Sequence, residues 1–147
     1  MQCKKVVVVK YKSTWIPTKG SENSSGYDLV AAHDYKLCYN SPTIVKTGLF
    51  LAIPPGFEGQ VRSRSGLALK GIVVLNSPGI IDSDYRGELG VMLVNLNDTF
   101  QGYRINRGDK VAQLAICRIP DVQFERVEEL SNTLRRAGGF GFQSTGR

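Results

Sequence analysis

The sequence predicts an all-β, antiparallel domain, built as a sandwich or a barrel-like fold. Two observations predict it. The apolar segments are short and β-rich, and turns containing proline, glycine or asparagine separate them at near-regular intervals. Helical periodicity is scarce, so we expect at most a short helix. The main expected strands cover residues 6–11, 44–53, 72–75, 89–96 and 110–119.

The expected strands are bounded by local signals. Residues 6–9 are four consecutive valines, which favour a strand. The second strand ends at a Pro-Pro-Gly turn (54–56), the third at Ser-Pro-Gly (77–79) and the fourth at Asn-Asp (97–98), and an Arg-Gly-Asp turn (107–109) precedes the fifth. Residues 60–64 alternate partly between apolar and polar, which predicts a further strand.

One short helix is expected over residues 66–70. Ser65 would cap it, because a serine oxygen can accept from the unpaired N–H groups of a first turn. Residues 122–130 fit a strand and a helix equally well. No linker divides the chain, so residues 1–134 are expected to form one β-rich domain, followed by a mobile glycine-rich segment over residues 135–147.

The composition is that of a globular protein in a reducing compartment. The chain has 147 residues, of which 41% are hydrophobic and 22% charged, as expected for one domain. No apolar run is long enough to span a membrane and no signal-peptide core is present, so a cytoplasmic location is expected. Three widely spaced cysteines and a single histidine argue against disulfide pairing and against a zinc site.

The charge balance indicates an anionic partner. The formal net charge is +6 and the pI is about 9.4, which favours nucleic acid, a membrane surface or a phosphorylated small molecule. A merely basic surface is the alternative. The charges form no long run, which argues against a polybasic membrane anchor.

Residues 76–90 hold the most informative polar segment. Asp82, Asp84, Tyr85 and Arg86 read as a hairpin turn that brings two carboxylates, an aromatic ring and a guanidinium together. A carboxylate near an arginine stays ionised and can take a proton from water if it is placed correctly. The alternative is a solvated turn with a local Asp–Arg ion pair.

Three other segments contain candidate ligands for an anion or a metal. Residues 62–71 suit a phosphate, because they combine an arginine, a serine hydroxyl and backbone N–H groups left accessible by glycine. A capped helix explains the same residues. Asp28 lies between apolar neighbours and needs a cation, an arginine or backbone donors, in a metal site or a structural hydrogen bond. Gln113 lies in an apolar strand and could reach a phosphate or only a neighbouring strand.

Together with the tail, these segments resemble, in order, the five motifs of the homotrimeric dUTPases (deoxyuridine 5′-triphosphate nucleotidohydrolases). The resemblance spans nearly the whole chain, and its strength lies in five motifs occurring in order. The matching segments are Gly-Tyr-Asp-Leu (26–29), Arg-Ser-Gly-Leu-Ala (64–68), Gly-Ile-Ile-Asp-Ser-Asp-Tyr-Arg-Gly (79–87), Arg-Gly-Asp-Lys-Val-Ala-Gln-Leu (107–114), and Gly-Gly-Phe-Gly with Ser-Thr-Gly (138–141 and 144–146).

The resemblance implies a jelly-roll-like, β-clip domain that assembles as a homotrimer with sites shared between subunits. It implies Mg²⁺-dependent hydrolysis of dUTP to dUMP and pyrophosphate, which limits uracil in DNA and supplies dUMP for thymidylate synthesis. By the same resemblance, Asp82 is the general base that activates the attacking water, and Asp28 holds Mg²⁺ through coordinated water.

The remaining site residues follow from the same resemblance. The third motif reads the uracil edge through its backbone, and Tyr85 packs against deoxyribose where a ribose 2′-hydroxyl would clash. The lid over residues 135–147 brings an arginine to the terminal phosphate and a phenylalanine onto uracil. The substrate-binding residues implied are Arg64, Ser65, Gly66, Asn76, Gly79, Ile80, Ile81, Tyr85, Gln113, Arg135, Phe140, Gly141, Ser144 and Thr145.

The chain departs from the family pattern at several positions. Lys110 and Val111 stand where arginine and isoleucine are common, and Ser63 stands where proline is frequent. The insertion Phe142-Gln143 interrupts the fifth motif. It leaves two choices open: Arg136 competes with Arg135, and Phe142 competes with Phe140.

Three other functions compete with this interpretation. A nucleic-acid-binding β-barrel with an Arg/Gly/Phe tail is disfavoured, since few aromatics lie on the expected strand faces. A deoxycytidine-triphosphate deaminase shares the wider fold, but the Asp-Ser-Asp-Tyr segment (82–85) fits the pyrophosphatase pattern better. A dUTPase fold kept mainly as a protein-interaction module is the third alternative, but the intact motifs argue that catalysis is retained. The expected partners are therefore dUTP and further copies of the chain, with neither nucleic acid nor a membrane.

Overall fold

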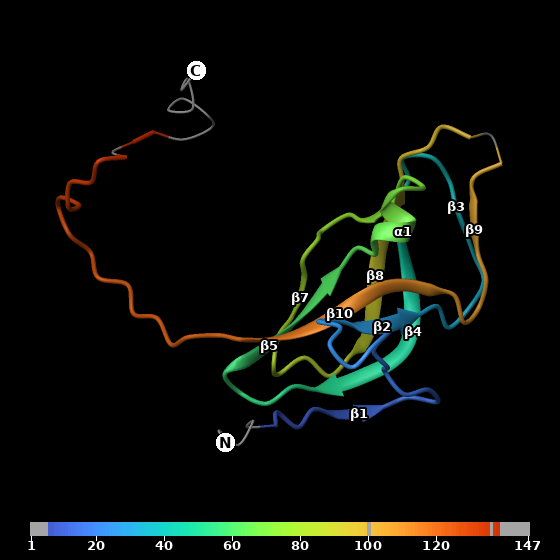
Figure 1. The fold of residues 1–147 in the computed structure, drawn as a ribbon, viewed down its shortest axis with the longest axis horizontal. Coiled ribbons are helices and arrows are strands. Elements are labelled where there is room, and N and C mark those ends of the chain that lie inside the picture. Colours follow the sequence, from blue (N-terminus) through green and yellow to red (C-terminus); the bar gives the residue numbers. More distant parts are fainter. Residues whose placement is uncertain (1–5, 100, 136, 139–147) are drawn as a thin grey trace.

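The computed structural model describes residues 6–99, 101–135, 137 and 138. Within these residues, ten strands form two four-stranded sheets and one two-stranded sheet, and every ladder between named strands is antiparallel. Figure 1 shows the sheets packed together, with a short helix at one end. The all-β antiparallel prediction with one short helix is confirmed.

The first sheet has the strand order β1-β4-β8-β6. Its strands are β1 (Lys10–Lys12), β4 (Thr43–Ala52), β8 (Glu88–Asn95) and β6 (Ile72–Val74). The second sheet has the order β2-β10-β5-β7, with β2 (Tyr27–Val30), β10 (Lys110–Arg118), β5 (Phe57–Arg62) and β7 (Gly79–Ile81). A separate pair joins β3 (Tyr35–Leu37) to β9 (Tyr103–Ile105).

The core is formed by alternate residues of the long strands. On β4, Val45, Leu49 and Leu51 are buried, while Ile44 and Lys46 are exposed. This alternation follows from the period of two residues in a strand. Each fully buried leucine or valine contributes on the order of 2 kcal/mol through removal of apolar surface from water. The central strand β8 adds further buried apolar residues, namely Leu89, Val91, Leu93 and Val94.

Two local predictions at the ends of elements are wrong. The first strand begins only at Lys10, so the valines at 6–9 precede it. Ser65 does not cap the helix: α1 spans Ser65–Ala68, its N-cap residue is Arg64, and that residue makes no side-chain cap hydrogen bond. The serine lies inside the first turn rather than before it, because the extended backbone of Arg64 (φ −94°, ψ 132°) already leads into the helix.

The segment 82–87 is not a hairpin turn but a connection between the two sheets. β7 pairs with β5 in the second sheet, whereas β8 pairs with β4 and β6 in the first. Because β4 and β6 occupy both edges of β8, no edge of β8 is left for β7. The local sequence signals a turn correctly, but it does not say which strands the turn joins.

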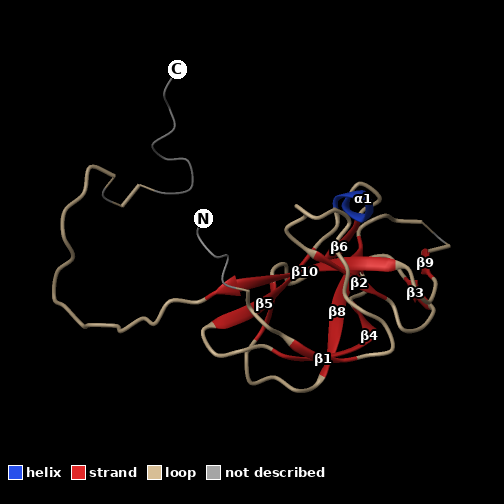
Figure 2. Ribbon diagram, turned by 60° about the horizontal axis from the view of Figure 1, so that its bottom comes forward, coloured by secondary structure: helices blue, strands red, loops and turns tan. Residues whose placement is uncertain are grey.

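Beyond β10 the chain leaves the domain. Figures 1 and 2 both show it running away from the sheets as an extended loop. Residues 119–135 form neither the strand nor the helix considered for 122–130, and all are exposed, including Phe124 at 95%. In the part of the chain that the structure describes, no helix is long and apolar enough to cross a membrane.

Candidate active site

The second sheet brings most of the predicted site residues together. Asp28 on β2 lies opposite Gln113 on β10, and Gln113 in turn lies opposite Arg62 on β5. The segment Arg64, Ser65 and Gly66 follows β5 directly, as the chain enters α1. Residues 79–81 form β7, which ends at Ile81, directly before Asp82. The fold thus gathers on one sheet four motifs that are far apart in the sequence.

Asp28 is held between two cations. Its carboxylate Oδ2 lies 2.7 Å from Lys110 Nζ, and its Oδ1 lies 3.5 Å from Arg64 Nε. The Asp28 side chain is only 15% exposed, so these cations compensate the cost of removing its charge from water. The prediction that this aspartate needs a cation or an arginine is confirmed. The sequence motif marks Lys110 only as a replacement for arginine and does not predict its contact with Asp28.

Arg64 is fixed by a second contact. Its Nη1 donates to the backbone carbonyl of Lys110 at 3.0 Å, which joins the segment after β5 to the start of β10, beyond the last ladder pair of Arg62 with Gln113. The two cations also line one pocket of about 400 Å³ together with Leu67, Tyr103 and Ile105. Ser65 and Gly66 are exposed beside Arg64.

Gln113 is positioned by two neighbours. Its Nε2 donates to the carbonyl of Ser63 at 2.9 Å, and its Oε1 packs against Gly26. A Cβ atom on Gly26 would lie 2.7 Å from that oxygen, so a larger residue there would displace the side chain of Gln113. The Ser63 hydroxyl accepts from the backbone N–H of Val74 at 2.9 Å and thereby ties the two sheets together. Sequence reasoning missed this role of Ser63, which proline could not fill.

At the other edge of the sheet, β7 carries the segment predicted to read a base. Asn76 is exposed, and its side chain lies against buried Gly79, where a Cβ atom would be 3.2 Å from Asn76 Nδ2. Ile80 is exposed, and Ile81 packs against the core. β7 is the outermost strand of its sheet among the described residues. One row of its N–H and C=O groups therefore faces no further strand there.

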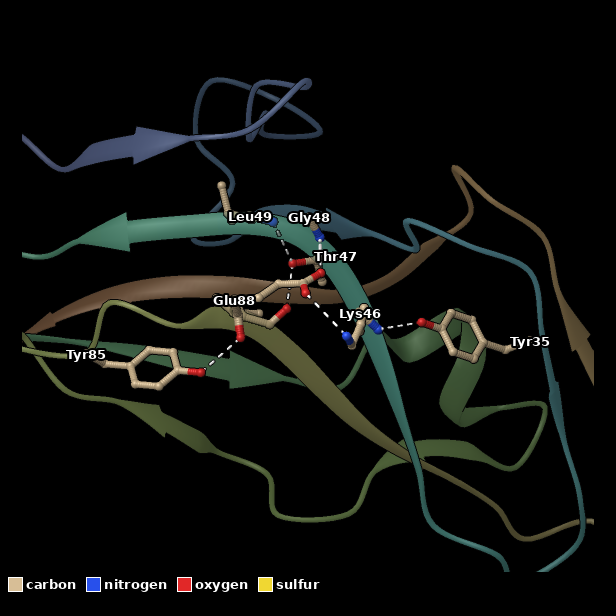
Figure 3. A network of polar contacts seen from close by, with 8 residues as sticks. Tyr35, Lys46, Thr47, Gly48, Leu49, Tyr85 and Glu88 are labelled. Atoms are coloured by element: carbon tan, nitrogen blue, oxygen red, sulfur yellow. Dashed lines mark hydrogen bonds and ion pairs between the residues drawn. The ribbon is translucent and has the colours of Figure 1, made fainter.

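The turn after β7 is held by hydrogen bonds to backbone carbonyls. The N–H of Tyr85 donates to the carbonyl of Asp82 at 3.1 Å, and the Tyr85 hydroxyl donates to the carbonyl of Glu88 at 3.0 Å (Figure 3). Arg86 Nη1 donates to the carbonyls of Ser83 and Tyr85, at 2.7 and 2.8 Å. The side chain of Asp82 is exposed.

The local Asp–Arg ion pair considered for this turn is not formed: within residues 6–99, no ion pair joins Arg86 to Asp82 or Asp84. The guanidinium instead donates to the backbone carbonyls of Ser83 and Tyr85, within its own turn. Arg86 thus stabilises the turn and leaves the carboxylate of Asp82 on the surface.

The two groups of candidate residues lie at different places on the sheet. Asp28 is level with Arg62, whereas Ile81 is level with Gly59, three residues along β5 and three strand spacings away from β2. With about 3.3 Å per residue and 4.8 Å per strand, the α-carbons of Asp28 and Ile81 are about 17 Å apart. One chain therefore does not bring Asp28 and Asp82 into a single contact.

Of the predicted lid, only the beginning is described. Arg135 Nε donates to the carbonyl of Gly138 at 2.9 Å, and the N–H of Gly138 donates to the carbonyl of Arg135 at 3.1 Å, which forms a local turn. Phe140, Gly141, Ser144 and Thr145, with the alternatives Arg136 and Phe142, lie outside the described residues. The choice of register in the lid stays a prediction.

Comparisons with known proteins agree with the fold and the motifs. The family model described as dUTPase matches residues 12–145. A deoxyuridine 5′-triphosphate nucleotidohydrolase of Wolbachia pipientis subsp. Culex pipiens (strain wPip) is 50% identical over 141 residues, which cover 92% of this chain and 90% of the relative.

Solved structures agree as well. A mutant dUTPase of Staphylococcus bacteriophage 80alpha with dUpNHpp superposes with a TM-score of 0.84 at 27% identity, over 92% of this chain and 97% of that one. A mutant dUTPase from phage phi11 of S. aureus, described for its coordination of a structural Mg(II) ion, gives a TM-score of 0.74 at 28% identity, over 83% and 97% of the chains. The chain belongs to the dUTPase family, enzymes that hydrolyse deoxyuridine 5′-triphosphate.

Proposed function

We propose that this dUTPase cleaves dUTP to dUMP and pyrophosphate by attack of water on the α-phosphorus, in a Mg²⁺-dependent reaction. The proposal rests on two separate groups of polar residues on the second sheet. Asp28, Arg64 and Lys110 form a charged cluster on one side, and the edge strand β7 runs into the exposed Asp82 on the other. Such an arrangement suits a substrate with a polar base and a polyphosphate.

Asp82 is the proposed general base. Its carboxylate is exposed at the end of β7, and the turn that follows is held without it, through the contacts of Tyr85 and Arg86. A carboxylate in this position can orient a water and take its proton. Phosphoryl transfer needs little else from the protein than positioning and charge neutralisation.

Arg64, Ser65, Gly66 and Gln113 are proposed to hold the phosphates. Arg64 lies within 3.5 Å of Asp28 and lines the pocket beside it, and the amide of Gln113 is oriented by Ser63 and Gly26. A guanidinium can form two parallel hydrogen bonds to a phosphate. Arg64 and Gln113 already make these contacts before a nucleotide binds, which lowers the entropy cost of binding it.

The residues present fit a magnesium ion that arrives with the nucleotide. No group of three or more His, Cys, Asp or Glu side chains that could hold a metal occurs among the described residues, so the protein offers Asp28 rather than a cage. Magnesium is commonly held by one or two carboxylates together with substrate phosphates and water. Asp28 would hold it through coordinated water, and the bound ion would neutralise phosphate charge.

β7 and the segment before it are proposed to select the base and the sugar. The edge position of β7 leaves backbone donors and acceptors that could pair with the uracil edge, with Asn76, Gly79, Ile80 and Ile81 around it. The ring of Tyr85, held through its hydroxyl, would pack against deoxyribose and exclude a ribose 2′-hydroxyl.

We further propose that the working enzyme is a homotrimer with shared sites. Two observations support this assembly: the separation of about 17 Å between the Asp28 and Ile81 α-carbons, and the exposed apolar side chains beyond β10, such as Phe124 and Leu130. A second copy could supply the missing half of each site, and the lid with Arg135, Phe140, Gly141, Ser144 and Thr145 could close over it. In the cytoplasm the reaction would limit uracil in DNA and supply dUMP for thymidylate synthesis.

The test is a pyrophosphate-release assay with dUTP, UTP, dTTP and dCTP, each with and without Mg²⁺, combined with analysis of the mass of the assembly. We expect turnover of dUTP alone, dependent on Mg²⁺, from a particle of three chains. Release of ammonia from dCTP would favour a deaminase. Salt-sensitive oligonucleotide binding without nucleotide turnover would favour the nucleic-acid-binding alternative.

A further inference from the structure

A bulge in β4 interrupts the pairing of the two longest strands of the first sheet. Lys46 lies opposite Gly90 and Phe50 lies opposite Glu88, so three residues of β4 (47–49) face only Leu89 on β8. A bulge of this kind takes backbone groups out of the ladder and requires other partners for them. The partners found here connect the bulge to the beginning of β8.

The buried side of the bulge is fully satisfied. Thr47 is fully buried; its hydroxyl donates to the carbonyl of Leu89 at 2.6 Å and accepts from the N–H of Leu49 at 3.2 Å. The indole N–H of Trp15 donates to the carbonyl of Thr47 at 2.8 Å. Any shift of the bulge would leave buried polar groups unpaired, which costs about 1–3 kcal/mol per group. The bulge is therefore a rigid support.

The outer side of the bulge is held by Glu88. Gly48 has a φ of +66°, a conformation that favours glycine, and its N–H donates to Glu88 Oε1 at 2.9 Å. Lys46 Nζ lies 3.8 Å from Glu88 Oε2, but the Lys46 side chain is mostly exposed, so this ion pair contributes little. Figure 3 shows the carboxylate of Glu88 turned toward β4. The hydrogen bond to Gly48 is thus the main tie between Glu88 and the bulge.

The backbone of the same residue holds Tyr85. The carbonyl of Glu88 accepts the Tyr85 hydroxyl, and Gly87, the residue before it, lies against the ring. A Cβ atom on Gly87 would collide with the Tyr85 hydroxyl, so the ring lies directly over the Gly87 backbone. A continuous set of contacts therefore joins Gly48, Glu88 and Tyr85 (Figure 3).

We propose that Glu88 is a positioning residue for sugar selection: its carboxylate fastens the start of β8 to the β4 bulge and thereby fixes the carbonyl that orients Tyr85. This inference rests on the proposed contact of Tyr85 with deoxyribose. To exclude a single ribose hydroxyl, the Tyr85 ring must be held rigidly. A displacement of about 1 Å in a site can change rates on the order of 10²-fold. Tyr85 is 44% exposed, so the Gly87 backbone and the Glu88 carbonyl provide much of what holds the ring in place.

The test compares dUTP with UTP. In Glu88→Met the side chain keeps a similar size but loses the acceptor for the Gly48 N–H, and we expect the ratio of kcat/KM for dUTP to that for UTP to fall about 10-fold. Glu88→Gln keeps an amide oxygen as acceptor and should retain the ratio within about twofold. Lys46→Met, which removes only the neighbouring ammonium, is the matched control and should also retain it.

A double-mutant cycle separates positioning from general stability. Tyr85→Phe removes the hydroxyl that the Glu88 carbonyl holds, so it should lower the dUTP/UTP ratio by itself and make a further Glu88→Met change nearly silent. An equal fall for both substrates, or fully additive effects of the two substitutions, would overturn the proposal. If Glu88→Met does not fold, an unchanged ratio in Tyr85→Phe overturns it. A wild-type enzyme that does not hydrolyse dUTP would instead refute the proposed function.

Discussion

The two sides of the candidate site are stabilised by different means. On the β2 side, the side chains of Asp28, Lys110 and Arg64 hold one another, with Asp28 largely buried. On the β7 side, the side chains of Tyr85 and Arg86 donate to backbone carbonyls, and the proposed general base, Asp82, is exposed. The first side is preformed within one chain. The second depends on how the turn between the sheets is supported.

The largest effect is expected from removing the acid of the β7 side. Asp82→Asn keeps the size of the side chain but loses a carboxylate able to take a proton, so kcat should fall about 10³-fold. Binding of a non-hydrolysable dUTP analogue, measured by calorimetry, should change little. Asp84→Asn in the same turn is the matched control. Near-normal turnover by Asp82→Asn would remove the assignment of the base.

Deletion of residues 135–147 tests whether the candidate site is active without the predicted lid. No strand or helix of the described structure includes these residues, so the truncated protein should unfold at an unchanged temperature. We expect kcat/KM for dUTP to fall about 10²-fold, because lid closure completes such sites and excludes water. The measurement is pyrophosphate release beside a thermal melt. An unchanged kcat/KM would show that residues 135–147 do not contribute to catalysis.

Thr47→Val tests how much the β4 bulge, which holds Glu88 and through it the turn after β7, contributes to stability. The substitution removes the hydroxyl that pairs with Leu89 and Leu49, and it should lower the free energy of unfolding by about 2 kcal/mol. Urea unfolding measures the change. Thr43→Val on the same strand is the control, since its hydroxyl makes a single long contact of 3.4 Å to Ser41. Equal losses in both variants would contradict a special role of the bulge.

The smallest effect is expected on the β2 side. Lys110→Met removes one of the two cations beside Asp28, which should raise KM for dUTP about fivefold with kcat nearly unchanged. Lys110→Arg should behave as the wild type, because arginine restores the charge. Lys36→Met removes an exposed ammonium on β3 and controls for net charge. A fall in kcat rather than a rise in KM would give Lys110 a role in the chemical step.

The sequence predicts a local feature of the site where a charged residue lies between apolar neighbours. An aspartate between apolar neighbours needs a cation, and Asp28 has two. The turn at 82–87 was recognisable, but its hairpin interpretation was wrong, because strand alternation does not encode which edge of which sheet a strand joins. The positive φ of Gly48 and the carboxylate of Glu88 meet only through tertiary pairing, since 40 residues separate them in the chain.

The edge position of β7 has a consequence for how this enzyme can change over time. Peptide groups are chemically the same in every residue except proline, so a base read by the main chain is insensitive to which side chains the strand carries. If β7 reads the base as proposed, exposed Ile80 can change to many other residue types without altering the nucleobase preference. Sugar preference, by contrast, would depend on one aromatic ring. Evolution, or an engineer, would find the sugar easier to alter than the base.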